Sequence, residues 1–144
     1  KGSKHHLLVD ERGVPLSIVV TGANRHDVSQ LENVLKGKVI CKPADNEVVE
    51  NLYADAGYTG ESANNTMEAE AYIPHVRPRG EEIAEKDRNP EFKPRRWIVE
   101  VSLSWFNRFR KLHVRHEKLL STHMALTHLA AAIIALRKVD IIYG

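Results

Sequence analysis

Residues 48–58 read VVENLYADAGY, an apolar run that stops at an aspartate followed by two small residues. The mostly apolar residues from Val48 to Ala54 predict a buried, central β-strand. In open α/β sheets, ligand sites gather where strands end, because a side chain there is held by rigid structure and still reaches solvent. Asp55 is therefore a candidate site residue, although an Asp that hydrogen-bonds its own turn gives the same pattern.

A β-hairpin is predicted before this strand. Residues 5–9 and 14–20 are apolar and rich in β-branched side chains, and the residues between them, Asp10 to Gly13, have turn chemistry. Gly13 supplies the positive φ that such a turn needs. The hairpin and the strand after it indicate that the chain begins its fold with sheet rather than helix.

Helices alternate with strands along the rest of the chain. Asp27 or Ser29 can cap the first helix. The elements expected after the hairpin are a helix through about Leu35, the strand 48–54, a helix 61–71, a strand 72–76 and helices 95–112 and 119–136, with surface connections at 36–47 and 77–94. The last helix is apolar enough to be mostly buried. This order indicates a mixed α/β domain.

The composition is that of one soluble globular domain. The chain has 144 residues, 42% of them hydrophobic and 28% charged, which allows one proper core and not two. No signal peptide is visible, and the most apolar stretch, Leu129 to Leu136, is far short of a bilayer span. The single Cys41 cannot form an internal disulfide, which fits a cytoplasm, and it has no evident base partner that would make it a nucleophile.

A basic segment lies inside an otherwise acidic chain. From Lys93 to Lys118 there are eight Lys or Arg against two Glu, a formal charge of +6 in a chain whose total is +2. Such a block predicts a surface for a polyanion, with a solvated helix face as the plain alternative. The side chains placed to hold DNA phosphates are Arg95, Arg108, Arg110, Lys111 and Arg115, with Arg77 and Arg79 in a second, weaker loop.

Glu100 is the second carboxylate that stands out. It lies within the apolar stripe 97–101, so we expect it to be partly buried, and a buried charge needs a partner or a metal. Arg96, one helical turn earlier, is a possible structural partner. Asp55 and Glu100 together would also suit Mg²⁺, which prefers oxygen ligands. The histidines at 113, 116, 123 and 128 lack the spacing of a zinc site, and a helix N-terminus explains Asp27 more simply than a metal does.

Five blocks of this sequence resemble, in the same order, the bacterial insertion-sequence DDE transposases. The blocks are residues 4–16, 21–27, 53–58 and 72–80, and the closing block 95–110 with Arg95-Arg96-Trp97-Ile98-Val99-Glu100. The resemblance covers nearly the whole chain. It implies a ribonuclease-H-like mixed sheet flanked by helices and lacking its first strand, so that residues 1–144 form the C-terminal part of the catalytic domain.

The resemblance also implies a chemistry. In the family, three acids hold two Mg²⁺ or Mn²⁺ ions, and water and then a 3′-hydroxyl attack a DNA phosphodiester. By motif position, Asp55 corresponds to the second Asp, Glu100 to the Glu, and Arg96 to the Arg that precedes this Glu. The implied partners are double-stranded DNA, at the element ends and the target, and further copies in a homo-oligomeric complex at the bacterial nucleoid.

Three departures from the family pattern leave alternatives open. No position here matches the first Asp, since Asp10 corresponds to the turn of the hairpin. Ala56 and Val101 stand where relatives often carry basic residues, and lost positive charge weakens phosphate binding. The chain is therefore expected to be inactive alone, or else to be a non-catalytic DNA-binding or dimerising remnant. A ribonuclease-H-like nuclease acting on RNA hybrids is a third alternative.

Overall fold

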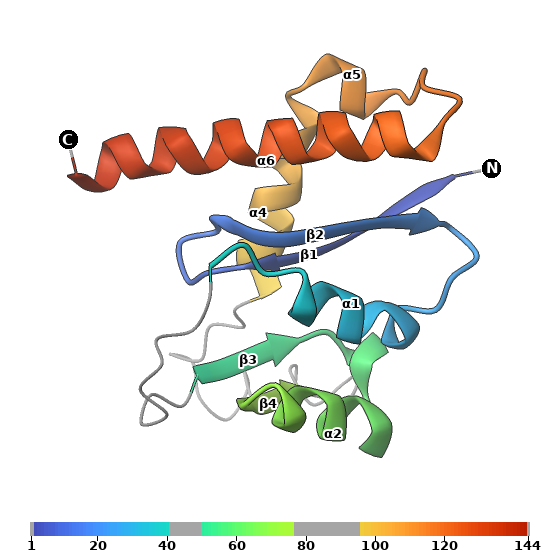
Figure 1. Ribbon diagram of the computed structural model, residues 1–144. Coiled ribbons are helices and arrows are strands. Elements are labelled where there is room, and N and C mark those ends of the chain that lie inside the picture. The colour runs from blue at the N-terminus through green and yellow to red at the C-terminus, as the bar shows by residue number, and fades with distance from the viewer. Residues whose placement is uncertain (1, 41–49, 77–95, 144) are drawn as a thin grey trace, which may run out of the picture.

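The computed structural model describes residues 2–40, 50–76 and 96–143, without the side chains of 96 and 140–143. The elements are β1 (Ser3–Val9), β2 (Pro15–Gly22), η1 (Val28–Gln30), α1 (Leu31–Lys36), β3 (Glu50–Ala54), η2 (Ala56–Tyr58), α2 (Glu61–Ala69), β4 (Tyr72–Val76), α4 (Arg96–Asn107), α5 (Arg110–His113) and α6 (Leu120–Tyr143). The predicted mixed α/β order is confirmed (Figure 1). Of the connections that we expected at 36–47 and 77–94, residues 41–47 and 77–94 lie outside the described residues.

The β1–β2 hairpin forms as its turn residues predict. The strands pair antiparallel with Leu8 opposite Ser17, and the register shifts after Leu8. The Asp10 carboxylate accepts hydrogen bonds from the backbone N–H of Arg12 and Val14, at 2.9 and 2.7 Å. Gly13 has the predicted positive φ, 82°. Asp10 therefore serves the turn, as its motif position indicated.

In the part of the chain that the structure describes, the strands form two sheets of two strands each, and the single mixed sheet that we expected stays a prediction. β3 pairs in parallel with β4, with Leu52 opposite Pro74, and α2 makes the crossover between them. Within the described residues, β3 has one hydrogen-bonded neighbour strand and is not central. Figure 1 shows the β3–β4 sheet beside the hairpin rather than continuous with it. A groove lies between the two sheets, with Leu8 of the hairpin, Leu52 of β3 and Val99 of α4 among its lining residues.

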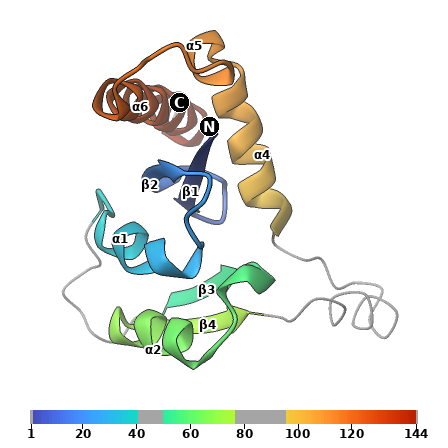
Figure 2. The same ribbon diagram turned by 90° about the vertical axis from the view of Figure 1, so that its right-hand side faces the viewer.

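Two hydrophobic clusters hold the elements together. The first joins the hairpin to α1, α2, β3 and β4 through Leu8, Leu31, Val34, Leu35, Leu52, Ala63, Met67 and Tyr72. The second joins the hairpin to α4, α5 and α6 through Ile18, Phe106, Leu112, Ala130 and Ile134. Because successive strand residues face opposite ways, the hairpin contributes to both clusters. Figure 2 shows α1 and α2 on one side of the strands and α4 on the other.

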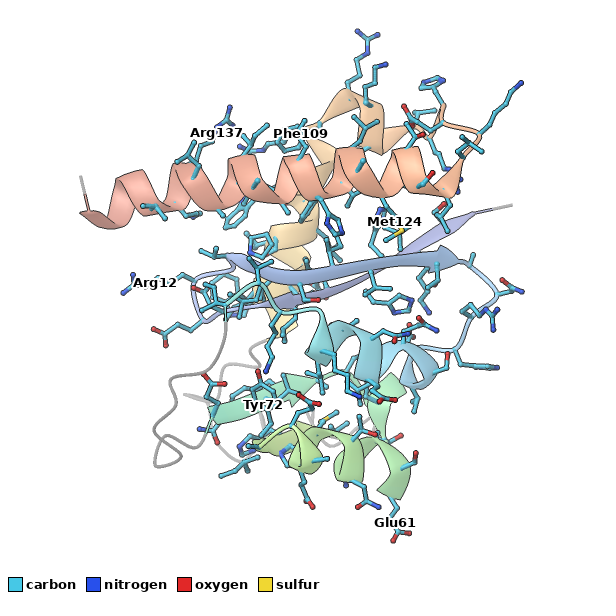
Figure 3. The ribbon with its side chains drawn as sticks, in the orientation of Figure 1. Arg12, Glu61, Tyr72, Phe109, Met124 and Arg137 are labelled. Carbon is cyan, nitrogen blue, oxygen red and sulfur yellow. The ribbon has the colours of Figure 1, made fainter. Side chains whose placement is uncertain are left out.

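The helix expected over 95–112 is two helices. α4 ends at Asn107, where the N–H groups of Arg108 and Phe109 bond back to Trp105 and Phe106. Phe109 is extended, with ψ 104°, and α5 follows. This break lets Phe109 and Leu112 pack against α6, where Figure 3 labels Phe109. Trp105 and Phe106 pack inward in the second cluster.

α6 is longer and more exposed than predicted. It extends to Tyr143, and Leu129 and Leu136 are 58% and 63% exposed, so the expectation of a mostly buried helix was wrong. Only one face, with Ala130 and Ile134, packs on the second cluster. By length and composition alone, Leu120–Val139 is apolar enough to cross a membrane. The apolar stretch is therefore longer than the eight residues, Leu129 to Leu136, that we identified in the sequence. The inner face of α6 is apolar because it packs against β2, α4 and α5.

Candidate active site

Asp55 lies at the carboxyl end of β3 and is exposed. It caps the short helix η2, and its carboxylate accepts a hydrogen bond from the backbone N–H of Ala56 at 2.6 Å. Its carbonyl accepts a second one from Tyr58 at 2.8 Å. The turn interpretation of Asp55 is thus correct as local geometry. The same bonds hold an exposed carboxylate in a defined place at a strand end.

Asp27 is the acidic neighbour of this turn. A Cβ added to Gly57, two residues after Asp55, would lie 3.5 Å from the Asp27 Oδ2 atom. Lys4 Nζ lies 2.7 Å from Asp27 Oδ1 and 2.8 Å from Oδ2, so the ammonium bridges both oxygens of the carboxylate. Asp27 makes no side-chain cap bond, and the Ser29 hydroxyl donates to the carbonyl of His26. The capping role expected of Asp27 or Ser29 was therefore wrong, because Lys4 binds the carboxylate instead.

The pKa of Tyr58 reflects the negative charge around this turn. Burial, together with the negative charges of Asp27 and Asp55, raises the pKa of the Tyr58 phenol to about 12. Both carboxylates therefore act on one hydroxyl, although they lie far apart in sequence. At neutral pH this hydroxyl keeps its proton.

His6 completes the neighbourhood of Asp27. Its Nδ1 lies 3.4 Å from Asp27 Oδ1, and its Nε2 shares a 2.9 Å hydrogen bond with the Thr21 hydroxyl. Burial lowers the pKa of His6, with Asp27 opposing that shift. Sequence reasoning missed Lys4, His6 and Tyr58 as site residues. Their only signal in the sequence was that they lie in blocks that resemble the family, residues 4–16 and 53–58.

Glu100 is exposed, which corrects the expectation of partial burial. The inward face of α4 carries Ser102 and Phe106, which are four residues apart and buried. Residues two positions apart do not share a helix face, so Glu100 points away from that core. The side chain of Arg96 is outside the described residues, so its pairing with Glu100 stays a prediction.

The Glu100-bearing turns of α4 border the same groove as β3. Ile98 and Val99 line that groove together with Leu52 and Tyr53, which precede Asp55. In Figure 2 the start of α4 lies at the side of the β3–β4 sheet. The two elements that carry the predicted acids are therefore neighbours. Within the described residues, no three His, Cys, Asp or Glu side chains form a metal-binding group.

The predicted DNA-binding cations gather elsewhere. Arg108, Arg110, Lys111 and Arg115 are all exposed, at the α4–α5 corner and just after it. Arg115 donates a 2.6 Å hydrogen bond to the Ser3 hydroxyl, which ties this region to the start of β1. In both ribbon views, α5 lies on the far side of the hairpin from β3. Arg77, Arg79 and Arg95 lie outside the described residues.

The other polar candidates lie away from Asp55. His123 is buried, 3.8 Å from a Glu117 carboxylate oxygen, and its ring is 5.7 Å from the ring of His5. His113, His116 and His128 are exposed. Cys41 lies outside the described residues. None of these histidines, which the structure describes, adds a chemical group to the Asp55 turn.

Comparison with known proteins points to one family. The profile of the family described as "Transposase DDE domain" matches residues 1–135. The chain is 30% identical, over 96% of its length, to a protein of Burkholderia cepacia named as the transposase of insertion sequence element IS402. It is also 30% identical, over 94% of its length, to a Brucella ovis protein named as the transposase of element IS6501.

The two relatives differ in length. The match covers 98% of the IS6501 protein but 66% of the IS402 protein, so this chain spans less than two thirds of the longer relative. No solved structure matches the chain.

Proposed function

Because the chain belongs to the transposases with a DDE domain, we propose that it takes part in metal-dependent cleavage and strand transfer of DNA during transposition of an insertion sequence. Asp55 and Glu100 are the acids that we assign to the metal site, with Arg96 beside Glu100. The observation that carries this proposal is the placement of Asp55. It is an exposed carboxylate, held by its own turn, at the end of a strand whose groove α4 also lines.

The residues present fit part of a site for Mg²⁺ or Mn²⁺. These ions prefer carboxylate oxygens, and both assigned acids are exposed enough for a phosphate to reach them. When bound, the ions would neutralise charge on the phosphate and activate the attacking oxygen. We propose that a third acid comes from a strand outside residues 1–144. On this proposal the chain is the C-terminal part of the catalytic domain and is inactive by itself.

Residues of this chain hold the Asp55 carboxylate in place and set the charge around it. The Ala56 N–H fixes one oxygen of Asp55, which limits its rotation. Lys4 neutralises Asp27, so that a second negative charge near the turn repels a DNA phosphate less. The protonated Tyr58 can donate a hydrogen bond close to both acids.

The exposed cations at the α4–α5 corner are proposed to hold duplex DNA. Lys and Arg bind the phosphate backbone without reading sequence, and their contacts position the duplex. Because this corner lies across the hairpin from β3, it would hold DNA that flanks the cleaved bond. The ends of the insertion sequence and the target DNA both have to be bound, so we propose that the active complex is a homo-oligomer. We propose that it acts in the bacterial cytoplasm, at the nucleoid.

The test is DNA nicking by this chain joined to a segment that supplies the third acid. In Mn²⁺, Asp55→Asn and Glu100→Gln should each lower the nicking rate by about 100-fold or more, the scale seen when one electrostatic group of a site is lost. Glu61→Gln is the matched control, since Glu61 points outward at the start of α2 (Figure 3). Circular dichroism checks that the variants fold. Wild-type rates in both acid variants would rule out the assignment.

A second candidate function is a DNA-binding remnant without catalysis. The exposed Arg108, Arg110 and Lys111 favour it, because they can bind a duplex whatever happens at Asp55. The same variants distinguish the two functions. Salt-dependent duplex binding that neither acid variant nor Mn²⁺ changes, with no nicking by any variant, supports the remnant.

A further inference from the structure

The outer face of α6 carries a regular row of small and apolar side chains, the outer stripe. Its members are exposed and recur every three or four residues: Thr122, Ala125, Leu129, Ala132, Leu136 and Val139. Three of them, Leu129, Leu136 and Val139, are large apolar side chains. Figure 2, which looks along this helix, shows α4, α5 and the hairpin on one side of it. A spacing of alternately three and four residues is that of a helix that packs along a second helix.

The inner face of α6 is separate from the outer stripe. Its buried residues are His123, Thr127, Ala130 and Ile134. Ala130 and Ile134 pack in the second cluster, and the Thr127 hydroxyl donates to the carbonyl of His123 at 2.8 Å. The core of the single chain therefore uses the inner face. Exposed apolar residues that are scattered singly need no partner, but a row over about five helical turns indicates an interface.

The charge of this segment limits the kind of partner. Residues Leu120 to Leu136 include no Lys, Arg, Asp or Glu. DNA is not the expected partner, because Lys and Arg bind its phosphates. A helix that lies on a membrane surface carries Lys and Arg beside its apolar face, and this segment lacks them. The outer stripe therefore fits an apolar protein surface.

The order of side chains along the outer stripe is complementary in size to its own reverse. A two-fold axis that crosses the stripe between Leu129 and Ala132 aligns the α6 helices of two copies antiparallel. The facing pairs are then Leu129 with Ala132 of the partner subunit, Leu136 with Ala125 of the partner subunit, and Val139 with Thr122 of the partner subunit. Each large side chain faces a small one, which fills the contact without voids. A parallel pair would set Ala opposite Ala and leave cavities.

We propose that the outer stripe is an antiparallel, two-fold symmetric interface between two copies of this chain. It rests on the proposed function only in naming a surface for the homo-oligomer, and it does not involve the metal site. The apolar segment Leu120–Val139 has 20 residues and is about 30 Å long. Two helices of this length bury on the order of 1,000 Å² in total, the lower limit for a specific interface. The dimer therefore forms at micromolar concentration, and the dilute chain is a monomer whose stripe is exposed.

Sedimentation equilibrium of the 144-residue chain, without DNA or metal, measures the dimer. We expect the monomer mass of 16.3 kDa in dilute solution and twice that mass as the concentration rises. Leu129→Glu puts a charge beside the two-fold axis and should weaken dimerisation at least tenfold. Ile73→Glu is the matched control, because Ile73 is 45% exposed on β4, across the hairpin from α6. Circular dichroism checks that both variants fold.

A size swap tests the antiparallel register. Ala132→Leu puts Leu opposite Leu129 of the partner subunit, which overpacks the contact and should weaken the dimer at least tenfold. Adding Leu129→Ala restores one large and one small side chain in each pair. The double variant should therefore dimerise within about threefold of the parent chain. Both positions are exposed in the monomer, so these changes test the interface rather than the fold.

Several outcomes would overturn the interface. A monomer at about 1 mM, the weak end of specific association, would exclude it. A dimer that Leu129→Glu leaves intact, or that Ala132→Leu strengthens, would exclude this surface or this register. Sedimentation with vesicles of phosphatidylcholine and phosphatidylglycerol, in a chain that stays monomeric, would make lipid the partner. Loss of the dimer on joining the segment that supplies the third acid would make that segment the partner.

The assignment of the acids fails separately from the interface. If the chain dimerises while Asp55→Asn still nicks DNA, the interface stands and the assignment of Asp55 falls. If nicking depends on Asp55 but the protein is a monomer throughout, the interface falls and the assignment stands.

Discussion

Gly13 shows at the scale of one residue how the hairpin turn is fixed to α4. Its carbonyl lies 2.8 Å from the hydroxyl of the fully buried Ser102, and the Ile98 carbonyl lies 2.9 Å from it, so the two carbonyls share the one proton that this hydroxyl donates. A Cβ at this position would lie 2.8 Å from Ser102 Oγ and 3.2 Å from the Trp105 ring. Both the positive φ and the close packing therefore exclude a side chain.

Gly13→Ala should lower the free energy of unfolding by about 1–3 kcal/mol, from backbone strain and the clash with Ser102. Urea denaturation measures the change. Gly2→Ala is the matched control, because its Cβ would meet only Ala23, at an ordinary 3.4 Å. Equal midpoints for the two variants would contradict this account.

His5 and His6 make stability depend on pH. Burial lowers the pKa of both side chains from the ordinary value of 6.5, and the charge of His123 lowers that of His5 further. The unfolded chain therefore binds protons more readily than the folded one. Stability should be complete above pH 6.5 and should fall as the pH drops below 6.5 toward the folded-state pKa values.

Urea midpoints between pH 7.5 and pH 5.5 (about one unit either side of an unperturbed His) measure this loss. His6→Gln should give a shallower fall of the midpoint than the parent chain, because it removes one of the two side chains whose pKa is lowered. His128→Gln, at an exposed position on α6, should show the same fall of the urea midpoint with pH as the parent chain. A parent midpoint that rises on acidification would contradict the sign.

At the scale of elements, the helices differ in how much of their surface they bury. α1 is six residues long and buries Leu31, Val34 and Leu35 in the first cluster. α6 is 24 residues long and leaves Leu129, Leu136 and Val139 exposed. Length and apolarity alone would predict that α6 buries a larger share of its surface than α1. The opposite is observed, because burial depends on which elements pack against each helix.

Leu35→Ala should cost about 2–5 kcal/mol, because Leu35 is 1% exposed and its loss leaves a cavity. Leu136→Ala should change stability by less than about 0.5 kcal/mol, since that side chain is 63% exposed. Thermal unfolding of the two variants compares them directly. A larger loss for Leu136→Ala would show that another surface covers α6 in solution.

At the scale of the whole molecule, the hairpin is the element that both hydrophobic clusters share. Leu8 belongs to the first cluster and Ile18 to the second, so the hairpin links the β3–β4 half to the helical half. The groove runs along this junction, between the edges of β1 and β3. The two elements that carry the assigned acids, β3 and α4, meet at the same junction.

Local features were predictable from the sequence by itself. The hairpin, the positive φ of Gly13, the end of β3 at Asp55 and the start of α2 after Gly60 all follow from the preferences of neighbouring residues. These features depend on a few adjacent peptide units, so the residues that cause them lie within one turn or strand.

Only the tertiary structure decided what distant segments do together. The Lys4–Asp27 pair spans 23 residues, and it removed Asp27 from the capping role that its own segment suggested. The exposure of Glu100, the two separate sheets and the uncovered face of α6 likewise depend on which surfaces meet. Residue preferences describe one segment at a time, whereas burial and ion pairing depend on the neighbours that the fold brings to it.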